Sequence, residues 1–229
     1  MARADAALRD ISVAVREGTP EWPGDTPFSC RWTWVMAQGA SVNVSAIGGS
    51  PHVGTHADAP LHVKDGWPGA HELPLEAFHG ECLVVDVSAQ EAGGAGITLD
   101  ALEGAAREAG ASIDRVERLL LRTGRTIAAG AFPGGWPAVR EDCARALLGR
   151  GLRLLGVDCP SVDDRESKTL PVHHMVFGGN ACVLENLDLR RTPPGEYELI
   201  APPLKLMALD AAPVRALLRE IRREPAADD

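Results

Sequence analysis

The sequence lacks the features of a membrane or secreted protein. No stretch approaches the roughly 18 consecutive apolar residues of a membrane-spanning helix. The first ten residues carry two arginines and two aspartates with no apolar run behind them, which is unlike a secretory signal. Five cysteines stand singly, and an odd number without paired spacing does not describe a disulfide framework. We therefore expect a cytoplasmic protein whose thiols are reduced and mostly buried.

Positive charge is also scarce. The chain has 23 Lys and Arg against 32 Asp and Glu, a net charge of -9. Tight binding to a phosphate backbone draws on clustered basic residues, so this balance disfavours nucleic acid as a partner. No Gly-x-Ser-x-Gly string supports a serine hydrolase. The run 121–126 lacks the Gly-Lys-Ser/Thr ending of a phosphate-binding loop.

The composition is that of an ordinary globular protein. Of 229 residues, 45% are hydrophobic and 24% charged, and there is no internal repeat, low-complexity tract or dividing linker. We expect one domain over residues 1–229, with the ends 1–7 and 223–229 frayed because they are small, polar or charged.

Short apolar and β-branched segments predict a strand-rich, mixed α/β fold. The expected strands are 8–15, 28–36, 42–47, 82–87, 116–121, 152–157, 182–187 and 197–200. Two helices are expected, one over 100–109 with Asp100 as its N-cap and one over 137–148 with Pro137 in its first turn. The polar run 158–168 follows a predicted strand, which is where functional loops commonly lie. The two tryptophans at 32 and 34 alternate on a predicted strand and are expected in the core.

Histidines are concentrated in one short segment. His52, His56 and His62 lie within eleven residues, with Asp58 between them. In an extended or loop backbone the even-numbered positions share a face, so all four polar groups can converge. Imidazole nitrogens with a carboxylate oxygen suit zinc or manganese. Gly54 allows a sharp turn between ligands. The alternative is a surface loop that happens to be rich in histidine.

A second candidate pair is His173 with Glu185. Glu185 follows the apolar residues 181–184, where an unpaired carboxylate is costly to bury. A metal ion would remove that cost. A partner arginine, or a position on the solvated face of a strand, would do so equally well.

The string from His52 to His62 reads HxGTHxDAPxH and resembles the signature of the cyclase-type metal hydrolases, which include bacterial kynurenine formamidases. Further segments follow in that family's order: 21–28 (EWPGDTPF), 156–163 (GVDCPSVD), 167–168, 173–174 and 184–186. The resemblance covers nearly the whole chain. It implies a swivelling β/β/α fold, usually dimeric, with two zinc ions per subunit.

Carried over by matching motif, the resemblance assigns roles to seven residues. His52, His56 and Asp58 would hold the first zinc, and Asp58, His173 and Glu185 the second. Asp58 and Glu185 would bridge the two ions. His62 would transfer protons, and Trp22 would line the substrate pocket.

The implied reaction is hydrolysis of N-formyl-L-kynurenine to L-kynurenine and formate in tryptophan catabolism. The nearest alternative is hydrolysis of another amide or lactam such as isatin, which the metal residues alone do not separate from the first. A non-catalytic metal-binding protein is a third interpretation. His62 speaks against it, because a purely structural site is normally closed and has no use for an added acid/base group.

Overall fold

The fold is that of a computed structural model, which describes residues 7–221. Apart from Ala7, the ends predicted to fray lie outside the described residues. Within them, no helix is long and apolar enough to cross a membrane. All five cysteines are free, and all except Cys30 are buried, as expected.

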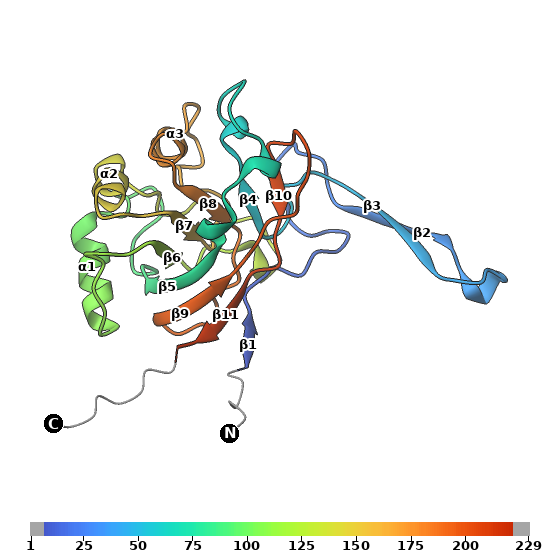
Figure 1. The fold of residues 1–229 in the computed structure, drawn as a ribbon, viewed down its shortest axis with the longest axis horizontal. Coiled ribbons are helices and arrows are strands. Elements are labelled where there is room, and N and C mark those ends of the chain that lie inside the picture. Colours follow the sequence, from blue (N-terminus) through green and yellow to red (C-terminus); the bar gives the residue numbers. More distant parts are fainter. Residues whose placement is uncertain (1–6, 222–229) are drawn as a thin grey trace.

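In the described part of the chain, nine strands form one sheet in the order β1-β11-β9-β5-β6-β7-β8-β4-β10 (Figure 1). The strands from β5 to β8 are parallel, and the other neighbours are antiparallel. Their bounds are β1 Leu8–Asp10, β4 His56–Asp58, β5 His79–Asp86, β6 Arg118–Arg122, β7 Leu154–Val157, β8 Cys182–Glu185, β9 Gly195–Ile200, β10 Ala211–Pro213 and β11 Leu217–Glu220.

Three α-helices pack on one face of the parallel strands (Figure 1). They are α1 Leu99–Glu108, α2 Glu141–Gly149 and α3 Pro171–Gly178. Alternate residues of β5 and β6 point into this helix layer and into a second apolar cluster on the opposite face, which includes residues of β9 and β11. Burial on both faces explains why β5 and β6 read as nearly continuous apolar runs. The predicted mixed α/β class is confirmed.

Several predicted boundaries were wrong. Helix α1 is capped by Thr98, whose side chain accepts the Ala101 N–H at 3.2 Å, and Asp100 lies in the first turn instead. Helix α2 begins at Glu141 because Val139 is still extended and pairs with Ile97. Strand β1 ends at Asp10, well before residue 15. Strands β4, β10 and β11 and helix α3 were not predicted.

The remaining strands form an arm, defined as β2 Ser29–Trp34 and β3 Val44–Gly48 with the turn between them. Within the described residues this pair is a separate two-stranded sheet, which projects away from the main sheet in Figure 1. Trp32 and Trp34 are 65% and 59% exposed, so the expectation that they belong to the core was wrong. The alternation of residue types that predicted this strand does not show whether the rest of the chain covers the strand. Single-turn 3₁₀ helices complete the fold at Met36–Gln38, Pro60–His62, Ala70–Glu72, Leu75–Phe78 and Ile127–Ala129.

Candidate metal centre

The centre of the site is built on two adjacent antiparallel strands, β4 and β8. His56 lies directly opposite Glu185 in the register of this pair. Asp58 is two residues beyond His56, so both side chains leave the same face of β4. All three are almost completely buried, with exposures of 1% to 3%. Strand pairing therefore brings two carboxylates and an imidazole together inside the protein.

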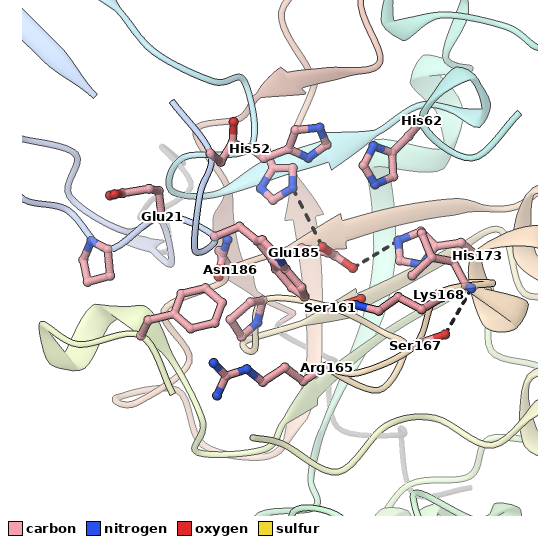
Figure 2. Close-up of a pocket in the computed structure, with 17 residues that line it drawn as sticks. Glu21, His52, His62, Ser161, Arg165, Ser167, Lys168, His173, Glu185 and Asn186 are labelled. Carbon is pink, nitrogen blue, oxygen red and sulfur yellow. Dashed lines mark hydrogen bonds and ion pairs between the residues drawn. The ribbon is translucent and has the colours of Figure 1, made fainter. Parts of the chain in front are cut away.

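Helix α3 adds His173. Its Nε2 lies 3.3 Å from Asp58 Oδ2. The same atom lies 3.3 Å from Glu185 Oε1 (Figure 2). Its Nδ1–H donates to Asp163 Oδ2 at 2.6 Å. The same Asp163 carboxylate accepts the N–H groups of Val172 and His173 at 2.9 and 3.0 Å, at the start of the helix. Asp163 therefore both stabilises the helix end and turns the imidazole so that Nε2 faces the cluster.

The segment before β4 supplies His52. Its Nδ1 lies 3.0 Å from Asp58 Oδ1. Gly54 has φ +77°, and a Cβ there would lie 2.4 Å from Val15 Cγ2, so only glycine fits this turn. Its carbonyl accepts Nδ1–H of His56 at 2.9 Å, which leaves Nε2 of His56 facing Asp58 Oδ1 at 3.2 Å. The turn predicted at Gly54 is present, and its carbonyl orients His56.

All five sequence-predicted ligand residues lie in this one cluster. Donor atoms of His52, His56 and Asp58 lie within 4.8 Å of one another, and so do those of Asp58, His173 and Glu185. Among the described residues, Nε2 of His56 and Oδ1 of Asp58 are buried without a hydrogen-bond partner. A buried polar atom left in this way is costly, and a cation between the donors would satisfy it. The residues present therefore fit a divalent metal.

The carboxylates of the site favour protonated histidines. Burial lowers the pKa of His52, but the carboxylates of Asp210 and Asp58 outweigh this and raise it to about 10. Burial likewise opposes charge on His173, yet Asp163, Asp58 and Glu185 raise its pKa well above the ordinary value. The cluster attracts positive charge, which a metal would supply in place of these protons.

His62 lies beside the cluster and not within it. Its side chain is 29% exposed, and its Nδ1 lies 3.4 Å from Asp210 Oδ2. It closes the 3₁₀ turn that begins at Pro60. Its ring centroid lies 4.5 Å from that of His52. This position next to the candidate ligands, but open to solvent, suits a group that exchanges protons with a bound molecule.

A cavity of about 410 Å³ opens above the cluster. His56 forms part of its lining. Figure 2 shows four further lining residues from the site: His52, His62, His173 and Glu185. Trp22 also lines it and is 39% exposed. Its ring meets Phe132 edge to face, with centroids 5.6 Å apart. The cavity thus has a polar base and an aromatic wall, and the structure places Trp22 in that wall.

Charged residues of both signs line the same cavity: Glu21, Asp25, Arg165 and Lys168. Figure 2 shows Lys168 reaching across the pocket toward Ser161. Lys168 has no hydrogen bond or ion pair with any other residue in the described range 7–221. The two cations come from the loop after β7, where the polar run had predicted a functional loop.

Sequence reasoning missed the contributions of Asp163, Asp210 and Phe132. Asp163 lay in a quoted segment, but its bonds to α3 depend on a helix that was not predicted. Asp210 and Phe132 carry no local signal, because their roles arise only from contacts with distant residues. Asp210 Oδ2 lies 2.9 Å from His52 Nε2, across 158 positions of the chain.

Comparison with known proteins agrees with this geometry. A model of the Cyclase family, described as "Putative cyclase", matches residues 9–164. The chain is 42% identical over 214 residues to a kynurenine formamidase of Bordetella avium (strain 197N), covering 93% of this chain and 98% of the relative.

Solved structures agree as well. One described as a potential metal-dependent hydrolase with cyclase activity is 28% identical, with a TM-score of 0.76 over 96% of this chain and 99% of the other. Isatin hydrolase A from Labrenzia aggregata is 26% identical, with a TM-score of 0.76 over 93% of each chain. These matches confirm the cyclase-like fold, and the chain belongs to the Cyclase family.

Proposed function

We propose that this chain hydrolyses N-formyl-L-kynurenine to L-kynurenine and formate. One water is consumed: its oxygen joins the formyl carbon, the carbon–nitrogen bond breaks, and a proton passes to the departing aryl nitrogen. The observation that carries the proposal is the cluster of His, Asp and Glu side chains at the base of an aromatic-walled cavity. The similarity to the Bordetella avium kynurenine formamidase supports the choice of substrate.

Two divalent metal ions are part of this proposal, with zinc as the first choice and manganese as an alternative. His52, His56 and Asp58 would hold one ion, and Asp58, His173 and Glu185 would hold the other; Asp58 and Glu185 would be shared. The grouped donor atoms support this assignment, and so does the buried Nε2 of His56, which faces two carboxylates without making a hydrogen bond within the described residues. When bound, such ions lower the pKa of water toward neutrality and polarise a carbonyl group.

His62 is the proposed acid/base residue. It accepts a proton from the attacking water and returns it to the aryl nitrogen as the carbon–nitrogen bond breaks. An imidazole ring can both accept and donate a proton, as the two halves of this shuttle require. Its place on the cavity wall, beside the cluster but outside the two ligand sets, supports the role.

Trp22 is the proposed contact for the aryl ring. Its indole is partly exposed in the cavity and held at its edge by Phe132 and Trp136, with centroids 5.6 and 5.9 Å away. A flat apolar surface held in this way suits stacking of an aromatic substrate.

The charged residues favour a substrate with an amino-acid end. Kynurenine carries an α-carboxylate and an α-ammonium group. Arg165 and Lys168 suit the first, and Glu21 and Asp25 suit the second. Isatin carries neither group, so hydrolysis of isatin or another lactam is the second candidate. The structural similarity to isatin hydrolase A supports this second candidate.

The arm supports a homodimer. An isolated two-stranded sheet is marginally stable in water, yet this one exposes Trp32, Trp34, Met36 and Ile47, each by more than half. Large exposed apolar residues gathered on one element mark an association surface, and a second copy of the chain is the proposed partner.

The five free thiols support a reducing, cytoplasmic setting.

The deciding experiment measures hydrolysis of N-formyl-L-kynurenine and of isatin by the same preparation, before and after metal is stripped with a chelator and zinc is restored. Turnover of the formamide that is lost on stripping and regained with zinc supports the proposal. Preference for isatin selects the second candidate. A protein that binds two metals and turns over neither compound is a metal-binding protein without this activity.

A further inference from the structure

Asp210 is fixed in place by the backbone of the metal-binding strand. Its carbonyl accepts the Ala59 N–H at 2.8 Å, and the next residue, Ala211, pairs with Asp58 in the β10–β4 register. These backbone bonds place the side chain of Asp210 next to the cluster, and they involve no metal ligand atom. Its side chain is 42% exposed, against 19% for His52 and 29% for His62.

One carboxylate oxygen of Asp210 contacts both of these histidines. Oδ2 lies 2.9 Å from Nε2 of His52 and 3.4 Å from Nδ1 of His62. His52 meanwhile directs its other nitrogen, Nδ1, at Asp58 Oδ1, 3.0 Å away. Asp210 thus contacts the ring nitrogen of His52 that is not directed at Asp58, and it also contacts one ring nitrogen of the candidate acid/base residue, His62.

We propose that Asp210 is a positioning residue that orients His52 for metal binding and His62 for proton transfer. The inference rests on the proposed function. By accepting Nε2–H of His52, Asp210 leaves Nδ1 free to bind metal. By accepting Nδ1–H of His62, it leaves Nε2 unprotonated and able to take a proton from water. One carboxylate therefore selects the useful tautomer of two imidazoles.

A rival interpretation is a third metal site. Donor atoms of His52, His62 and Asp210 also lie within 4.8 Å of one another. The partial exposure of His62 and Asp210, and the sharing of His52 with the buried set, favour the positioning role. The two interpretations differ in the number of ions bound, which is measurable.

The test compares Asp210→Asn, Asp210→Ala and Asp210→Glu with the wild-type protein. Asp65→Asn is the matched control, because Asp65 is an exposed carboxylate in the loop that follows His62. Three quantities are measured: kcat and KM for N-formyl-L-kynurenine, zinc affinity by competition with a chromophoric chelator, and zinc ions bound per subunit. Thermal unfolding of the metal-free proteins checks that each variant folds.

We expect Asp210→Asn and Asp210→Ala to lower kcat at least tenfold with KM nearly unchanged. Both variants should also bind the weaker of the two zinc ions about 10- to 100-fold less tightly. Asp210→Glu should restore part of both losses, and Asp65→Asn should match the wild type. Unchanged kcat and zinc affinity in Asp210→Asn would overturn the proposal. The proposal would also be overturned if the wild-type protein bound a third zinc ion and Asp210→Asn did not. Zinc affinity is measured without substrate. If the proposed reaction is wrong, the wild-type protein will bind zinc but show no turnover, which is distinct from failure of the role proposed for Asp210.

Discussion

At the scale of single residues, Asp58 has the most contacts within the cluster. Its carboxylate lies within 3.3 Å of three imidazoles, those of His52, His56 and His173. It is 1% exposed, so its charge is stabilised by those neighbours and not by water. Charge from the histidines holds the pKa of Asp58 well below its ordinary value, despite the opposing effect of burial. Both candidate ligand sets include Asp58, so its replacement would remove a ligand from each.

The role of His62 predicts a specific phenotype. His62→Ala should lower kcat by about 10²- to 10⁴-fold, the usual contribution of a general acid/base residue, while both metal ions remain bound. Steady-state kinetics with metal analysis of the same samples measures this. His79→Ala is the control, because His79 is an exposed histidine paired with Glu198 away from the cavity. Loss of metal from His62→Ala would make His62 a ligand instead.

Lys168 tests recognition of the amino-acid end. Lys168→Met should raise KM for N-formyl-L-kynurenine about tenfold or more, because a charge-assisted contact to the α-carboxylate is lost. Turnover of formanilide, a neutral aryl formamide, should hardly change. Lys205→Met, at an exposed position outside the cavity lining, serves as control. Equal loss with both substrates would argue against a carboxylate contact.

At the scale of elements, α3 has only eight residues, too few to be stable alone. Asp163 stabilises its first turn by accepting two backbone N–H groups and the Nδ1–H of His173. Helix formation and ligand orientation therefore depend on the same carboxylate.

Asp163→Ala should consequently affect stability and metal binding together. We expect a loss of about 1–3 kcal/mol in the free energy of unfolding, because buried donors lose their acceptor. Zinc affinity should fall by about 10- to 100-fold through misorientation of His173. Urea unfolding of the metal-free protein and a zinc titration measure the two effects. The exposed neighbour is the control: Asp164→Ala should change neither strongly.

The elements also explain what could be predicted from the sequence. His52, His56, Asp58 and His62 were predictable because strand β4 and its flanking turns bring neighbours in sequence together. Glu185 was detectable because a carboxylate in a buried strand needs a partner. Asp163 and Asp210 were not, since their contacts depend on α3 and β10, neither of which was predicted, and those of Asp210 also on residues far away in the sequence. Trp32 and Trp34 were misassigned because alternation is the same for a strand covered by its own chain and for an exposed one.

At the scale of the whole molecule, the arm predicts the oligomeric state. The double variant Trp32→Glu with Trp34→Glu should sediment as a monomer under conditions where the wild type is a dimer, because two charges would be placed in an apolar contact. Thr33→Glu, in the same strand, is the control for added charge. Analytical ultracentrifugation distinguishes the species. Identical sedimentation of the double variant and the wild type would exclude the arm as the contact.

Stability of the metal-free molecule should depend on pH. The folded-state pKa of His52 is about 10, above its ordinary 6.5, so its contribution is complete below about 6.5 and is lost as pH rises toward 10. His173 acts in the same direction. Urea unfolding of chelator-treated protein across this range should give a falling free energy of unfolding. His52→Gln should flatten the slope, and a slope unchanged by that substitution would contradict the assignment.

The candidate metal cluster joins parts of the chain that are far apart in sequence. Asp58 and His173 are 115 positions apart, yet Oδ2 of Asp58 lies 3.3 Å from Nε2 of His173. A metal held by both would close that long loop as a covalent cross-link does, in a protein whose cysteines form none. Metal supply would then govern how much folded protein a cell accumulates, in addition to how active each molecule is.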